Sequence, residues 1–192
     1  MFVKGLVLAT IALFIGVSIM PMAGSLSMKK CISTCDDISH IPSNTRGNTL
    51  YVGGTGEGNY TKIQDAIDNA SDDDTVFVYD DSSPYYESVL IKKPVSLIGE
   101  DRDTTVIYGC IDIRKTDGVT VSGFTFKKGW PAISLWLSSN NIIKGNSITD
   151  IQGGVVGGID AWCSSDNNII MDNMIVNNVA EEHFYGIFIQ EV

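Results

Sequence analysis

Aspartate, arginine and tryptophan recur at fixed positions of one five-residue motif. The four copies of the motif are Cys110-Ile111-Asp112-Ile113-Arg114, Ala132-Ile133-Ser134-Leu135-Trp136, Gly158-Ile159-Asp160-Ala161-Trp162 and Gly186-Ile187-Phe188-Ile189-Gln190. The second and fourth residues of each copy are aliphatic or alanine, which is the alternation of a half-buried β-strand. If the copies stack as neighbouring strands, their third and fifth residues form two columns on the outer face.

These two columns predict a surface that binds polysaccharide. Neighbouring strands lie about 4.8 Å apart, so Trp136 and Trp162 would form an exposed aromatic platform. Aromatic rings suit the apolar faces of sugars, whereas aspartate and arginine suit hydroxyl or carboxylate groups. The residues expected to bind the glycan are Asp112, Arg114, Trp136, Asp160 and Trp162. The alternative is that residues 149–157, or a neighbouring domain, cover the two tryptophans.

The same face offers a carboxylate pair for glycoside hydrolysis. Asp112 and Asp160 would lie two strands apart, or about 9 to 10 Å, which is the upper limit for an inverting pair. A catalytic acid also needs a raised pKa, usually caused by burial, and the sequence does not show which carboxyl is desolvated. The pattern therefore favours binding without catalysis, with Asp112 and Asp160 as the candidates if catalysis occurs.

A repeat of about 22 to 28 residues positions these strands. Val121-x-x-Phe124-x-Phe126, Ile143-x-x-Asn146-x-Ile148 and Ile170-x-x-Asn173-x-Ile175 share one spacing, and polar turns at 138–141 and 164–168 match each other. A strand-turn-strand unit that cannot bury its own apolar face must stack on its neighbours. The sequence predicts an all-β fold, a right-handed parallel β-helix.

One short α-helix is expected before the repeats. Ile63, Ala66, Ile67 and Ala70 form a stripe at helical spacing, and Thr61 with Gln64 fits a capping box. A helix of about three turns is not stable alone in water, so its stripe must cover an apolar surface. We expect it to cap the open N-terminal end of the β-helix.

The N-terminal residues resemble an export signal. Lys4 precedes an apolar run from residue 6 to residue 20, and Ala23-Gly24-Ser25 offers small residues for cleavage. The expected organisation is a signal peptide at 1–25, a linker at 26–47 and a β-helix domain at 48–192, incomplete at its C-terminal end. The protein is thus expected to be secreted or on the cell surface, with an uncleaved signal segment as the alternative route to a membrane.

The net charge and the small number of metal-ligating residues limit which partners and ligands the sequence predicts. A formal net charge of −10 argues against nucleic acid. Cys31 and Cys35 could form a disulfide, but with only His40 nearby a zinc site is not expected. No cofactor or metal is predicted. Cys110 and Cys163 are expected to be small buried hydrophobic residues.

Residues 48–192 resemble the pectin-lyase-like superfamily, and within it the NosD-like and archaeal cell-surface proteins with parallel β-helix repeats. The resemblance is carried by NYTKIQDAID (59–68), DTVFV (74–78), YYESV (85–89) and LIGE (97–100). It implies a β-helix fold, export, and a polysaccharide or cell-surface setting. Tyr86 and Glu87 resemble the first-coil motif of pectin methylesterases, but the later catalytic segments of that family are missing, so Glu87 is expected to be an exposed turn residue.

Copper handling, which the NosD name implies, finds little support in the sequence. His40 and His183 are the only histidines and lie far apart. The sequence favours an exported β-helix module that binds polysaccharide or a cell-surface glycan. The alternatives are a carbohydrate-active enzyme (hydrolase, lyase or esterase) and a structural fragment of a surface layer. The fragment hypothesis rests on the last motif copy, which no capping element follows, so the solenoid could continue beyond Val192.

Overall fold

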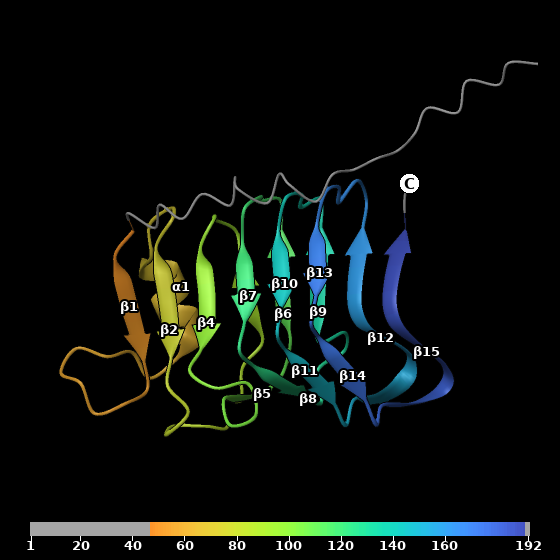
Figure 1. The fold of residues 1–192 in the computed structure, drawn as a ribbon, viewed down its shortest axis with the longest axis horizontal. Helices are drawn as coiled ribbons and strands as arrows, with labels where there is room; N and C mark the ends of the chain where they lie inside the picture. The colour runs from red at the N-terminus through yellow and green to blue at the C-terminus, as the bar shows by residue number, and fades with distance from the viewer. Residues whose placement is uncertain (1–46, 191–192) are drawn as a thin grey trace, which may run out of the picture. The chain divides into compact units, whose positions relative to one another are not determined.

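A computed structural model describes residues 47–190 as a parallel β-solenoid with one helix (Figure 1). Its strands form three parallel sheets, so that each coil of the solenoid contributes a strand to each sheet once the repeat is established. The predicted all-β parallel architecture is confirmed, while the right-handed sense of the coil stays a prediction. The expected signal peptide, most of the linker, Cys31, Cys35 and His40 lie outside the described residues.

The first sheet has six strands. In spatial order they are β1 (Thr49–Val52), β2 (Thr75–Val78), β4 (Ser96–Gly99), β7 (Thr120–Ser122), β10 (Ile142–Lys144) and β13 (Ile169–Met171). The second sheet contains β5 (Val106–Tyr108), β8 (Thr125–Lys127), β11 (Ser147–Thr149) and β14 (Met174–Val176). The third sheet contains β3 (Val89–Ile91), β6 (Ile111–Arg114), β9 (Ile133–Trp136), β12 (Gln152–Trp162) and β15 (Val179–Gln190).

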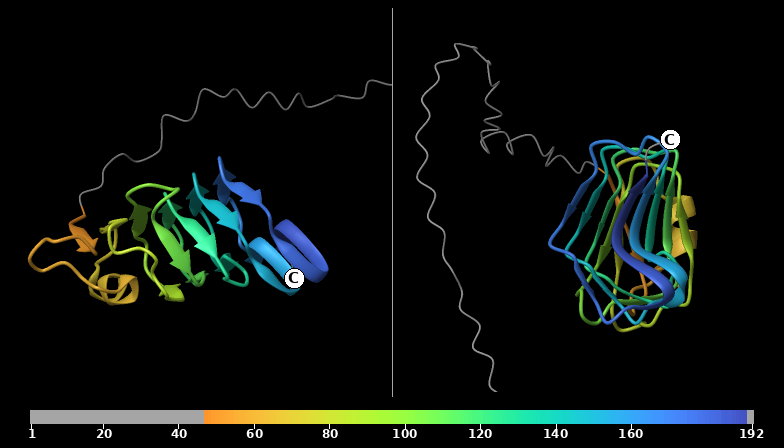
Figure 2. Two further views of the ribbon diagram at one scale, coloured as in Figure 1. Left: turned by 90° about the horizontal axis from the view of Figure 1, so that it is seen from below. Right: turned by 90° about the vertical axis from the view of Figure 1, so that its right-hand side faces the viewer.

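The interior is a stack of aliphatic and phenylalanine side chains. Seen along the axis, the coils superimpose around this shared interior (Figure 2). The inward residues of the motif in β6, β9 and β12 are all at most 4% exposed. Burying each such side chain stabilises the fold by about 1.5–3 kcal/mol, so the stack is the main source of stability. In β15 the corresponding Ile187 and Ile189 are 47% and 67% exposed, because no described strand stacks on them.

Helix α1 (Ile63–Asn69) lies against β1, β2 and β3. The predicted stripe of Ile63, Ala66, Ile67 and Ala70 is buried. Gln64 faces the edge strand β3, where its Oε1 accepts a hydrogen bond from the Leu90 N–H and its Nε2 donates to the Leu90 carbonyl. The helix therefore covers both apolar side chains and an open strand edge, which would otherwise be free to pair.

The predicted capping box of Thr61 and Gln64 is wrong. The N-cap residue is Lys62, which makes no side-chain capping bond. The cap comes from Glu87, whose carboxylate accepts hydrogen bonds from the Ile63 and Gln64 N–H groups at 2.8 and 3.1 Å. Glu87 is half-buried and structural, whereas its neighbour Tyr86 is 74% exposed. Glu87 is thus not the exposed turn residue expected from the sequence.

Asparagine side chains join the coils at two turns. Buried Asn146 accepts a bond from the Phe124 N–H and donates to the Val121 carbonyl, and Asn173 on the next coil accepts from Asn146. Asn141 and Asn168 repeat the arrangement at the preceding turn. These stacked amides satisfy backbone groups that the turns leave unpaired.

A left-handed residue follows β6, β9 and β12. Lys115, Leu137 and Cys163 have φ of 50–52°, and each donates its N–H to a strand-end carbonyl of the next coil, namely those of Trp136, Trp162 and Gln190. This repeated corner fixes the ends of the third-sheet strands relative to one another. Cys163 and Cys110 are free and only partly buried, rather than buried as predicted.

Candidate functional site: the outer face of the third sheet

The register of the third sheet places the predicted site residues in two adjacent columns. Asp112 pairs with Ser134, Ser134 with Asp160, and Asp160 with Phe188. In the second column, Arg114, Trp136, Trp162 and Gln190 follow one another on successive strands. The columns are those expected from the motif alignment, because a slip of one residue would turn the aliphatic side chains to the outer face.

A cavity of about 520 Å³ lies on this face. Its lining, which we call the aromatic cavity, consists of Arg114, Trp130, Pro131, Ser134, Trp136, Gly157, Asp160, Trp162, Tyr185 and Phe188. Four of the five predicted binding residues line it, and the fifth, Asp112, lies beside it. The volume falls within the range of small-molecule sites.

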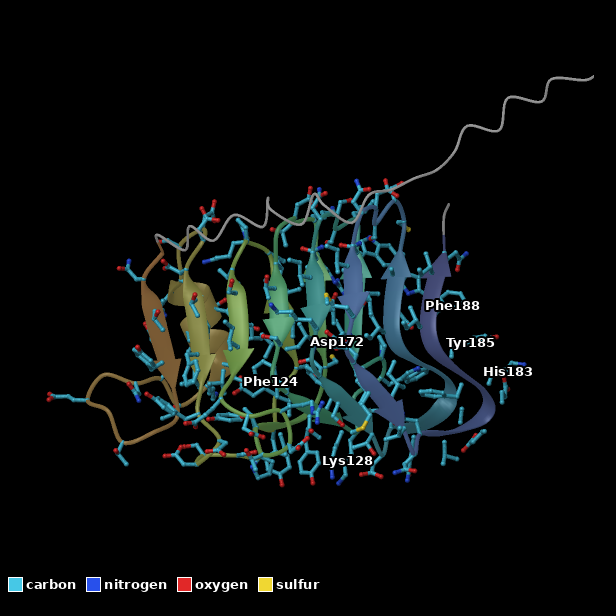
Figure 3. The ribbon with its side chains drawn as sticks, viewed as in Figure 1. Phe124, Lys128, Asp172, His183, Tyr185 and Phe188 are labelled. Carbon is cyan, nitrogen blue, oxygen red and sulfur yellow. The ribbon has the colours of Figure 1, made fainter. Side chains whose placement is uncertain are left out.

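Three further aromatic side chains complete the cavity. Phe188 lies 5.0 Å from Trp162 and 5.3 Å from Tyr185 between ring centroids, and Trp130, which is 61% exposed, also lines the cavity. Figure 3 shows Phe188, Tyr185 and His183 spaced along β15. Sequence reasoning placed Phe188 in the outer column without assigning it to the site, and missed Trp130 and Tyr185, which lie outside the repeated motif.

The tryptophans remain accessible in the described structure. Trp136 is 42% exposed and Trp162 is half-buried. Residues 149–157, which were the alternative cover, instead form the last residue of β11, a two-residue connection and the first six residues of β12. Gly157 of this stretch forms part of the cavity lining rather than a lid over it.

Asp160 is the buried acid of the cavity. The residue is only 9% exposed, and its Oδ1 has no hydrogen-bond partner within the described residues. Burial raises the pKa of Asp160, an effect that a hydrogen bond with the Trp162 side chain partly opposes. The unpaired Oδ1 is itself buried and lies against Gly157, so it can accept a hydrogen bond from a ligand hydroxyl only after the carboxyl rotates toward the cavity.

Asp112 orients Arg114. Its Oδ2 accepts an ion-paired hydrogen bond from an Arg114 terminal nitrogen at 2.6 Å. The hydrogen bond and the charge of Asp112 both raise the pKa of the Arg114 guanidinium. Asp112 is the more covered partner, with its side chain 22% exposed against 56% for Arg114. Asp112 thus positions the guanidinium, which itself lines the cavity.

Comparison with known families identifies the chain. The family model described as "Periplasmic copper-binding protein (NosD)" matches residues 67–192. The chain belongs to the NosD family. Neither curated proteins nor solved structures gave a match. The NosD description places the family outside the cytoplasm, in agreement with the expected extracytoplasmic location.

The copper in the NosD description does not fit the described residues. Within 47–190, no group of three or more His, Cys, Asp or Glu side chains is placed to hold an ion. His183 lies 6.2 Å from Tyr185 between ring centroids, and is the one histidine in this part of the chain. The residues gathered on the third sheet are therefore suited to stacking and hydrogen bonding rather than to copper ligation.

No helix within 47–190 has the length and apolar character needed to cross a bilayer.

Proposed function

We propose that this NosD-family chain is an extracytoplasmic β-helix module that binds polysaccharide in the aromatic cavity without cleaving it. The observation that carries the proposal is the pairing of Trp136 with Trp162 on adjacent strands, with Asp160 beside them in the same cavity. Two rings on strands about 4.8 Å apart offer a continuous apolar surface for the faces of successive sugars.

The polar groups of the cavity suit sugar hydroxyls. The Asp160 carboxyl lines the cavity, Ser134 lies between the two acids in the same column, and Arg114 is held by Asp112. Because these groups are fixed by strand register, little ordering is needed when a ligand binds, and binding costs less free energy.

A glycan array probed with the full-length chain tests this function. Binding of one or more glycans, with signals reduced by Trp162→Ala, is expected. Leu137→Ala is a matched control, because Leu137 follows Trp136 directly, has the same 42% exposure and lies outside the cavity lining. An array on which the wild-type chain binds no glycan would contradict the proposal.

The second candidate function is glycoside hydrolysis by Asp160 and Asp112. The observation that favours it is the buried Asp160 carboxyl, whose pKa is raised by burial, two strands from an Asp112 whose charge is balanced by Arg114. In this mechanism Asp160 would protonate the leaving glycosidic oxygen as its bond to the anomeric carbon breaks. Asp112 would take a proton from the water that bonds to that carbon.

Release of reducing sugar from polysaccharides bound on the array tests the second function. Hydrolysis predicts release by the wild-type chain and at least a hundredfold loss in Asp160→Asn and in Asp112→Asn. If the chain releases no reducing sugar, or if the variants release it as fast as wild type, these acids are not catalytic. Binding without release supports the first function.

A further inference from the structure

A second cavity adjoins the aromatic cavity on the same sheet. It has a volume of about 640 Å³ and is lined by Leu90, Lys92, Arg114, Lys115 and Trp136. Arg114 and Trp136 line both cavities, so the two cavities are neighbours that share these two side chains. We call the second part the basic cavity.

Three of its five lining residues are cationic, and none is acidic. This concentration is unusual on a chain whose formal net charge is −10. Within residues 47–190, neither Lys92 nor Lys115 forms an ion pair, whereas the adjacent Lys93 is engaged through its Nζ with the Asp68 and Ala70 carbonyls at the end of α1. Lys92 and Lys115 thus remain available to a ligand.

The backbone explains why two consecutive cations line one cavity. Along a regular strand, Arg114 and Lys115 would point to opposite faces. Lys115 instead has φ of 52°, and its N–H donates to the Trp136 carbonyl at 3.0 Å. This left-handed corner ends the alternation and allows both side chains to line the basic cavity.

Arg114 is oriented before any ligand arrives. Asp112 accepts from one of its terminal nitrogens, and the guanidinium keeps further N–H donors for other partners. A planar guanidinium with free donors matches carboxylate and sulfate oxygens, and the lysines add compact positive charges. The neighbouring Trp136 supplies an apolar wall for the sugar ring that bears the anion.

We propose that the basic cavity binds the anionic group of an acidic sugar, a carboxylate or a sulfate, while an adjacent sugar of the same chain stacks in the aromatic cavity. The inference rests on the proposed glycan binding and specifies its ligand class as acidic polysaccharide. Orientation follows from it: the charged sugar lies toward β3 and β6, and the stacked sugar lies toward β12 and β15.

Matched polysaccharides test the ligand class. The full-length chain is titrated with a uronate-containing polysaccharide and its carboxyl-reduced form, and with a sulfated polysaccharide and its desulfated form. We expect at least one acidic form to bind about tenfold or more tightly than its neutral counterpart. The pair that shows the difference tells carboxylate from sulfate. Added salt should weaken only the binding of the acidic form.

A double variant, Lys92→Gln with Lys115→Gln, tests the location. Removal of two exposed charge contacts should weaken the affinity for the acidic form roughly three- to tenfold and leave the affinity for the neutral form unchanged. The control is Lys62→Gln with Lys144→Gln, which changes the net charge equally at exposed lysines outside the cavity lining.

The possible outcomes separate the two proposals. Equal affinity for the acidic and neutral forms overturns the anionic site but leaves polysaccharide binding standing. Two other results overturn the basic cavity as the location of the anionic site. In one, the Lys92 and Lys115 variant leaves the preference for the acidic form unchanged; in the other, the control variant reduces that preference equally. If the chain binds neither form of any pair, the inference fails, and the glycan array alone then decides the proposed function.

Discussion

The Cα of Gly157 lies directly against the carboxylate of Asp160, so closely that a Cβ at this position would overlap the carboxylate oxygens. Both residues line the aromatic cavity and are buried. Gly157 therefore leaves the space that the buried acid occupies. The position of the Asp160 carboxylate thus depends on a glycine at residue 157.

Alanine at Gly157 should impair binding without unfolding the chain. The added methyl group must displace Asp160, and a terminal carboxylate can rotate away more easily than backbone can move. We expect a loss of glycan affinity of about tenfold, measured by titration calorimetry, with unchanged circular dichroism. Gly186→Ala is the control, because a Cβ there would meet only Ile175 at 4.0 Å. Equal affinities of G157A and wild type would show that Asp160 does not contact the glycan.

Asp160→Asn should increase stability at neutral pH. Burial raises the pKa of Asp160, so the folded chain binds this proton more tightly than the unfolded chain. The free energy of unfolding then falls as pH rises from the ordinary aspartate pKa through the raised value. We expect D160N to unfold at higher urea concentration than wild type at pH 7, and the difference to vanish below the ordinary pKa.

An exposed acid provides the control for that comparison. Asp172→Asn makes the same change of net charge on the first-sheet side of the solenoid, at an exposed left-handed residue that asparagine tolerates. Asp172→Asn should show no comparable gain in stability to urea at pH 7. A D160N chain that is no more stable than wild type at pH 7 would mean that Asp160 is not desolvated.

Removal of the Glu87 carboxylate should loosen the N-terminal helix. Glu87→Ala leaves the Ile63 and Gln64 N–H groups without their acceptor and should cost about 1–2 kcal/mol in the free energy of unfolding. Urea denaturation measures this loss, and Ser88→Ala at the exposed neighbouring position serves as the control. Equal midpoints for E87A and S88A would contradict the assigned cap.

The asparagine stack should be most important in the middle of the solenoid. Asn146→Ala leaves the buried Phe124 N–H without its acceptor and removes one donor from the Val121 carbonyl, which should cost about 1–3 kcal/mol. Asn173→Ala removes bonds to Asn146 and the Ile143 carbonyl, but at a half-buried position. Thermal unfolding should rank N146A as the less stable variant. The reverse order would be evidence against this account of the stack.

The columns of the third sheet could be predicted from sequence because strand stacking leaves little freedom. Once Ile133 and Ile159 are placed inside, alternation fixes Trp136 and Trp162 outside and on neighbouring strands. The helix stripe was predictable for a similar reason, since its apolar spacing admits one buried face. The five-residue motif therefore predicts the positions of most of the site residues.

The remaining features depend on contacts that the repeat does not encode. The Asp160 carboxyl packs against Gly157, three residues before it, and the cap on α1 comes from Glu87, 24 residues after Ile63. Tyr185 and Trp130 reach the cavity from outside the five-residue motif, so no repeat marks them. Local propensity cannot identify such partners, and it favoured a capping box that does not form.

Sugar rings are proposed to stack on Trp136 and Trp162. Titration of the strongest array ligand into wild type, Trp136→Ala and Trp162→Ala, with Leu137→Ala as control, measures this stacking. Loss of one stacking ring should cost about 1–2 kcal/mol, so each tryptophan variant should bind roughly five- to thirtyfold more weakly, and L137A should bind as wild type does. Wild-type affinity in both folded tryptophan variants would contradict the account.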